Sequence, residues 1–298
     1  MARIWAVQVI RVNKKIVLQT GIILLIFQIM QGQEKIVATI RPYAMILEEI
    51  TGTQVTCLLK AGDSPHTHTL LPSGIKEVER ADLFFYGHEN LDRWALDIPN
   101  NHLISMNALL PDTSREMIKS TFGKSRGDLL GEDPHFWLDP LAVDGLVPNL
   151  VDTLCVYIQL QCPDLRENSH VFSKKIHRLM IDLSLQLSTV KDKTVLLAHP
   201  FFQYYLDRFQ IHSIGIIEPI PGKEPTPKEI EEIIKAVLKN NVSAILVNEQ
   251  LSDRAAHLIA ESTGVPIIAL DPIGGLPGRM TYFELLRYNT GKLLQGIK

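Results

Sequence analysis

The sequence predicts an α/β protein in which two similar lobes with parallel sheets are joined by one long backbone helix. Three observations support this fold class. Short apolar runs alternate with amphipathic stretches from Lys35 onward, as strands and helical crossovers do. The apolar runs are continuous rather than alternating, which is typical of buried parallel strands. Residues 140–191 lack strand signals and contain a long helical stripe.

In the first half, short apolar runs predict three strands, and two stretches predict helices. The strands are expected over 36–40, 55–59 and 82–86. The helices are expected over 42–50 and 72–81. The first helix has the clearest limits, because Pro42 suits a first helical turn and Gly52 suits a C-terminal end. Together these elements form a predicted N-terminal lobe, residues 34–163.

The second half repeats this pattern. Strands are expected over 194–198, 212–217, 244–247 and 266–270. Helices are expected over 201–209, 226–239 and 253–262. The helix over 226–239 begins at Pro227, and one of its faces carries five apolar residues: Ile230, Ile233, Ile234, Val237 and Leu238. These elements form a predicted C-terminal lobe, residues 191–298.

Residues 164–190 predict a single linking helix between the two halves. Apolar residues recur there at helical spacing: Ile176, Leu179, Met180, Leu183 and Leu187. At 1.5 Å per residue this helix would be about 40 Å long. That is longer than a crossover within one lobe requires, so we expect it to join the lobes.

Residues 1–33 have the pattern of an export segment rather than of folded structure. Basic residues precede an apolar run, Ile16–Met30, which is typical of a secretory signal peptide. As a helix the run would measure about 22 Å, less than the ~30 Å hydrocarbon core of a bilayer. An uncleaved anchor and a buried element are the alternatives. We expect export to the periplasm, with a cleavage site that the sequence does not define.

The composition excludes several classes of protein. The formal net charge is 30 − 33 = −3, so no basic surface for nucleic acid is expected. Hydrophobic residues make up 46% and charged residues 21%, which is typical of a packed globular protein. Three cysteines permit one disulfide at most, and no CxxC pair offers thiolates to a metal. A metal site would therefore be built from histidine and carboxylate.

Four polar residues stand beside prolines in loops or at the ends of predicted strands: His66, His135, His199 and Asp271. Ligands of open α/β sheets bind outside the carboxyl ends of the strands. Three imidazoles and one carboxylate are a donor set that suits Zn²⁺. Taken singly, a loop histidine can be solvated or capping, and Asp-Pro is often only a turn. His68, two residues after His66, is a possible auxiliary metal ligand.

These residues and their order resemble the metal-binding receptors of ABC importers for zinc, manganese and iron. The resemblance covers about 35–298 and rests on five motifs: Pro65-His66, Asp133-Pro-His-Phe-Trp-Leu-Asp-Pro140, His199-Pro-Phe-Phe202, Glu224-Pro-Thr-Pro227 and Leu270-Asp-Pro-Ile-Gly274. It implies two related lobes on a backbone helix and a metal site between them, with His66, His135, His199 and Asp271 as ligands. It also implies a monomeric periplasmic receptor without enzymatic activity, which delivers its ion to an inner-membrane ABC permease.

The chain departs from the family pattern at two places, neither of which belongs to the four implied ligands. His68 stands where the family commonly has an aromatic residue, and 111–132 lacks the His- and Asp-rich loop of many zinc receptors. Three nitrogens and one carboxylate favour Zn²⁺, while Mn²⁺ and Fe²⁺ remain alternatives.

Two other classes of function remain open at this point. A metal-dependent hydrolase would use a histidine-bound zinc to activate water. Against it, Asp271 would fill the open coordination position, and no HExxH-type glutamate lies beside a ligand. A surface adhesin of the same fold is the other alternative.

Overall fold

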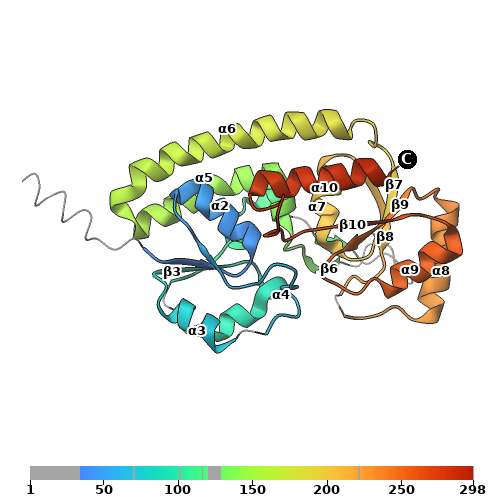
Figure 1. Cartoon of the computed structure of the whole chain (residues 1–298), viewed down its shortest axis with the longest axis horizontal. Coiled ribbons are helices and arrows are strands. Elements are labelled where there is room, and N and C mark those ends of the chain that lie inside the picture. Colours follow the sequence, from blue (N-terminus) through green and yellow to red (C-terminus); the bar gives the residue numbers. More distant parts are fainter. Residues whose placement is uncertain are drawn as a thin grey trace, which may run out of the picture. The chain divides into compact units, whose positions relative to one another are not determined.

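The computed structural model describes residues 34–69, 71–100, 102–115, 117–119, 129–220 and 222–297. The predicted export segment, residues 1–33, lies outside this range, so that prediction stays untested. Residues 35–298 form one compact unit, and its fold is α/β, as predicted (Figure 1). Among the described residues, no helix combines the length and the apolar character needed to cross a bilayer.

The first sheet has four parallel strands in the order β2-β1-β3-β4. Its strands are β1 (Ile36–Ala38), β2 (Thr56–Cys57), β3 (Leu83–Tyr86) and β4 (Leu103–Ser105). Helices α2 (Arg41–Thr51), α3 (Pro72–Glu79) and α4 (Glu89–Asp92) connect them. Pro42 lies in the first turn of α2, and Gly52 ends that helix with a φ of 67°, so both predicted limits are confirmed. A short hairpin, β5 (Met117–Lys119) with β6 (Leu129–Glu132), follows the sheet.

The second sheet also has four parallel strands, in the order β10-β9-β7-β8. Its strands are β7 (Thr194–Leu197), β8 (His212–Ile216), β9 (Ala244–Asn248) and β10 (Ile267–Leu270). The connecting helices are α7 (Gln203–Arg208), α8 (Pro227–Lys239) and α9 (Arg254–Thr263). In both sheets the first strand lies between the second and the third, with the fourth beyond the third. The shared topology confirms the prediction of two similar lobes.

The predicted linking helix is present as α6 (Cys162–Leu187), which starts two residues earlier and ends three residues earlier than expected. With 26 residues it is about 39 Å long. It packs against α5 (Pro140–Tyr157) and α2, and also against the C-terminal helix α10 (Tyr282–Gly296), which leads back from the second sheet (Figure 1). Because α6 contacts elements from both halves, one hydrophobic core extends through them. The lobe bounds 34–163 and 191–298 stay predictions.

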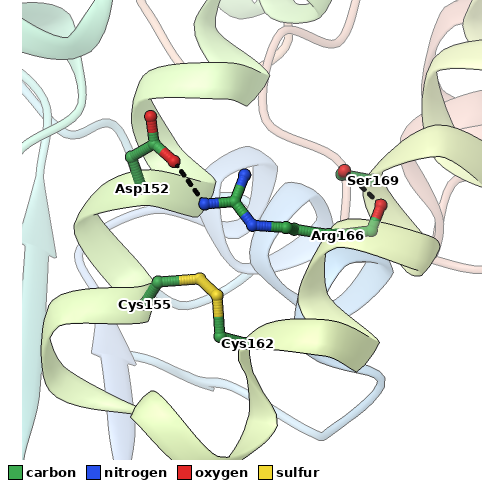
Figure 2. Close-up of a disulfide and its surroundings, with 5 residues drawn as sticks. All are labelled: Asp152, Cys155, Cys162, Arg166 and Ser169. Carbon is green, nitrogen blue, oxygen red and sulfur yellow. Dashed lines mark hydrogen bonds and ion pairs between the residues drawn. A yellow bond between two sulfur atoms is a disulfide. The ribbon is translucent and has the colours of Figure 1, made fainter.

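A disulfide joins Cys155 near the end of α5 to Cys162 at the start of α6 (Figure 2). Cys57 is the free cysteine. An ion pair of 2.9 Å between Arg166 and Asp152 connects the same two helices. The disulfide closes a loop of about eight residues, and by loop entropy it should stabilise the fold by about 2.5 kcal/mol. The turn from α5 into α6 is therefore covalently held at the point where the linking helix begins.

Candidate metal centre

The polar residues of the site come from strand ends and from two loops. In the second sheet, the chain just beyond each of the four strands carries one or more polar residues: His199 after β7, Glu218 after β8, Glu249 and Gln250 after β9, and Asp271 after β10. Because the strands are parallel, these ends share one edge of the sheet. From the first half, His66 lies in the loop after β2, and His135 lies between β6 and the short 3-10 helix η4 (Phe136–Leu138).

His66 and His135 face each other through their Nε2 atoms, which are 3.2 Å apart. Asp133 Oδ1 lies 2.6 Å from His135 Nδ1 and also accepts a hydrogen bond from the His135 backbone N–H. With the Nδ1 proton directed to Asp133, the lone pair of His135 is at Nε2. Two nitrogens bound tetrahedrally to one zinc ion at ~2.0–2.1 Å would lie roughly 3.3 Å apart. The observed separation fits two ligands of one ion.

His199 is the third imidazole of the group and is only 2% exposed. Its Nδ1 lies 3.3 Å from the backbone oxygen of Glu218, so Nε2 is left with the lone pair. That Nε2 is buried and has no hydrogen-bond partner among the described residues. The Glu218 carboxylate lies 4.0 Å from it. A buried nitrogen lone pair without a donor is what a metal ion would satisfy.

Two of the three imidazoles, those of His66 and His199, have lowered pKa values. Burial, and then the neighbouring His135 and His199, lower the pKa of His66 to about 3. Burial also lowers the pKa of His199, and His135 contributes in the same direction. Neutral imidazoles are the form that binds metals. At neutral pH these two imidazoles would thus need to lose no proton before binding a metal ion.

Asp271 is completely buried and has one saturated and one open oxygen. Oδ1 accepts hydrogen bonds from Gln250 Nε2 at 2.7 Å and from the backbone N–H groups of Ile273 and Gly274 at 2.9 and 3.0 Å. Oδ2 makes no hydrogen bond within the described chain, but it lies 3.1 Å from Arg279 Nη1, an ionic contact. Oδ2 is therefore the atom that could bind a cation.

Two hydrogen bonds tie the segment that carries His135 to the one that carries Asp271. Trp137 Nε1 donates to the Pro272 backbone oxygen at 2.7 Å, and Tyr282 OH donates to the Trp137 backbone oxygen at 2.9 Å. Both hydrogen bonds lie in the buried interior, so the two loops are fixed relative to each other.

The predicted ligand set is only partly assembled. The structure brings His66 and His135 into contact. The partners described for His199 are Glu218 and the Ser252 backbone, and those for Asp271 are Gln250, Asn289, Arg279 and the backbone. In the part of the chain that the structure describes, no group of three or more His, Cys, Asp or Glu side chains is arranged to hold a metal ion. The four-ligand site stays a prediction.

His68 lies apart from this group. Its ring lies 4.9 Å from the ring of Trp94, and its Nδ1 is 4.0 Å from an Asp63 oxygen. Its Nε2 is buried without a hydrogen-bond partner in the described residues. It lines a cavity of about 450 Å³ together with Asp63 and Gln250. Its auxiliary role also stays a prediction.

Sequence reasoning missed four side chains of the site: Asp133, Glu218, Gln250 and Arg279. Glu218 had a usable signal, since Glu218-Pro219 follows a strand in the same way as His199-Pro200. Asp133 begins the motif that runs to Pro140, but its contact with His135 depends on the local turn. Gln250 and Arg279 carry no motif and are recognised only by their contacts with Asp271.

Comparisons with known proteins agree with this architecture. The family model described as "ZnuA: Zinc-uptake complex component A periplasmic" matches residues 36–296. The zinc-binding protein AdcA of Streptococcus pyogenes serotype M3 is 26% identical over 310 residues, which cover 93% of this chain and 60% of AdcA. The chain thus spans about 60% of the length of the first curated relatives that it matches.

A second relative and a solved structure match over nearly their whole length. The metal ABC transporter substrate-binding lipoprotein SloC of Streptococcus mutans serotype c is 25% identical over 277 residues, covering 88% of this chain and 89% of SloC. A crystal structure of ZnuA superposes with a TM-score of 0.76 at 21% identity, covering 90% of this chain and all of that one. At that identity the likeness shows a shared fold.

Proposed function

Because the chain belongs to the family of periplasmic zinc-uptake component A proteins, we propose that it is an extracytoplasmic receptor that binds a divalent transition metal and delivers it to an ABC importer. The observation that carries this proposal is the arrangement of three imidazoles. His66 and His135 present Nε2 atoms 3.2 Å apart, and His199 supplies a third buried Nε2, which has no hydrogen-bond partner among the described residues. Asp271, through Oδ2, is the proposed fourth ligand.

Zinc is the proposed cargo. Three imidazole nitrogens and one carboxylate oxygen form a donor set that Zn²⁺ favours, whereas Mn²⁺ favours sites richer in oxygen. The name of the relative AdcA describes a zinc-binding protein, which supports the same choice. Mn²⁺ and Fe²⁺ are the alternatives that a competition experiment must include.

The receptor is proposed to act as a monomer outside the cytoplasm, with an inner-membrane permease as its partner. The disulfide between Cys155 and Cys162 supports this location, because such bonds persist in oxidising compartments. The relative SloC is named as a substrate-binding lipoprotein of a metal ABC transporter, which supports the kind of partner. We propose no enzymatic activity, since Asp271 would occupy the coordination position that a catalytic water needs.

A metal titration of the full chain tests the proposal. After removal of bound metal with a chelator, the wild type should bind about one Zn²⁺ per chain, in competition with a chromophoric chelator, and more tightly than Mn²⁺ or Fe²⁺. His135→Ala should weaken zinc binding by at least about 100-fold, because it removes one of the four proposed ligands. His257→Ala is the matched control, since His257 is 58% exposed on α9. Equal affinity in both variants would contradict the assignment of His135.

A further inference from the structure

The buried carboxylate of Asp271 is accompanied by a partly buried cation. Arg279 Nη1 lies 3.1 Å from Asp271 Oδ2, and the Arg279 side chain is only 11% exposed. The same Nη1 lies 2.9 Å from a carboxylate oxygen of Glu249. The guanidinium also stacks on Tyr288, 4.1 Å from the ring centroid. Arg279 thus stands between two carboxylates, of which Asp271 is the proposed metal ligand.

A tight turn of the backbone holds Arg279 in this position. The chain from Asp271 turns back on itself, and the Gly275 backbone N–H donates to the Arg279 backbone oxygen at 2.9 Å. Gly274 has a φ of 72°, and a Cβ there would lie 2.8 Å from the Arg279 oxygen. Only glycine fits this close approach at that φ. The turn therefore returns Arg279 to the carboxylate from which the loop starts.

The two oxygens of Asp271 have different partners. Oδ1 accepts three hydrogen bonds, whereas Oδ2 has the ionic contact with Arg279 and, within the described residues, no hydrogen bond. A buried carboxylate without a compensating charge is strongly destabilising. The Arg279 guanidinium supplies this positive charge at Oδ2, the same oxygen that would bind a metal ion.

We propose that Arg279 is an internal counter-ion that neutralises Asp271 while the site holds no metal and competes with the incoming cation for Oδ2. This inference rests on the proposed function, and it assigns to Arg279 the role of setting the affinity and the release rate of the cargo. Glu249 is the alternative acceptor, since it already contacts the guanidinium and is itself held by the Tyr288 hydroxyl at 2.8 Å. When the metal takes Oδ2, the charge of Arg279 stays paired with Glu249.

This arrangement makes two substitutions act in opposite directions. Arg279→Gln removes the competitor, so the zinc dissociation constant should fall by about tenfold or more and zinc release should slow. The melting temperature of the metal-free variant should also fall, because Asp271 loses its counter-ion. Glu249→Gln removes the alternative acceptor, so Arg279 should hold Asp271 more strongly and zinc affinity should fall several-fold. A residue that only supported the loop would weaken binding when removed.

The matched control is Arg287→Gln, which makes the same change in net charge on α10. Arg287 is 53% exposed and pairs with Asp182 at 3.4 Å, and its loss should leave zinc affinity unchanged. The assay is a zinc competition titration with stopped-flow release into excess chelator, on the full chain. If wild type and Arg287→Gln bind one zinc but Arg279→Gln binds no more tightly, the counter-ion proposal is wrong while the proposed function stands.

The remaining outcomes also decide between the two proposals. If the wild type binds no zinc, both proposals are overturned. Should Arg279→Gln not fold, Glu249→Gln is the remaining test: competition by Arg279 predicts a lower zinc affinity in that variant, and an unchanged or higher affinity would refute it.

Discussion

The lowered pKa of His66 predicts that the metal-free protein loses stability in mild acid. The His66 pKa is about 3 in the folded chain and 6.5 in an unfolded one. The unfolded state therefore binds more protons below pH 6.5, so the free energy of unfolding falls as the pH drops from about 6.5 toward 3. Above pH 6.5 this contribution is fully present.

Between pH 7 and pH 5 the expected loss from this one group is about 2 kcal/mol. At pH 5 an unfolded imidazole with a pKa of 6.5 is almost entirely protonated, whereas folded His66 is almost entirely neutral. Any folded pKa below about 4 gives nearly the same figure, because the unfolded state dominates the difference. The prediction therefore requires only that burial and the two neighbouring imidazoles keep folded His66 neutral at pH 5.

The measurement is urea denaturation of the wild type and His66→Gln with chelator present, at pH 7 and at pH 5. Other titrating groups, such as buried Asp92, are common to both proteins and cancel in the difference. The stability of the wild type relative to His66→Gln should fall by about 2 kcal/mol on going to pH 5. A difference that is the same at both pH values would show that His66 is not held neutral by its surroundings, and the reasoning would fail.

Two further predictions concern the support of the site and the linking helix. Asp133→Asn should weaken zinc binding by about 10- to 100-fold without unfolding the protein, because the Asp133 carboxylate fixes the His135 tautomer. A titration of zinc against a chromophoric chelator measures this loss. An unchanged zinc affinity would contradict the role of Asp133. Replacing both Cys155 and Cys162 by serine should lower the free energy of unfolding, measured by urea denaturation, by about 2.5 kcal/mol. Zinc affinity should stay unchanged. A reduced zinc affinity would instead link the α5–α6 turn to the site.

The elements that the sequence predicts well are those with strong local signals. Pro42 and Gly52 define α2, and the continuous apolar strands of the second sheet appear close to their predicted bounds. Strand β4 was missed because three half-buried residues make no periodic pattern. Helix α10 was also missed, although the capping box of Thr281 and Glu284 marks its start.

Within the candidate site, the sequence indicates which residue types stand at strand ends, but not which atoms meet. His66 and His135 are 69 residues apart, and the hydrogen bond from Trp137 to Pro272 spans 135 residues. Such contacts depend on how the two halves pack, which no local pattern encodes. The pairing of Asp271 with Arg279 was invisible for a different reason: it requires a tight turn at Gly274 that brings nearby residues face to face.

The charges around the proposed site suit a protein that binds and releases its ion better than one that keeps a metal permanently as a cofactor. The imidazoles of His66 and His199 are held neutral by burial, so they bring no negative charge to the site and need lose no proton at neutral pH. The carboxylate of Asp271 is already compensated by Arg279, so the net attraction for the cation is smaller than a free carboxylate would give. This compensation raises the energy of the loaded state relative to a site with an uncompensated carboxylate. A receptor must release its ion to a partner, and a counter-ion that remains beside the ligand on loading favours that release.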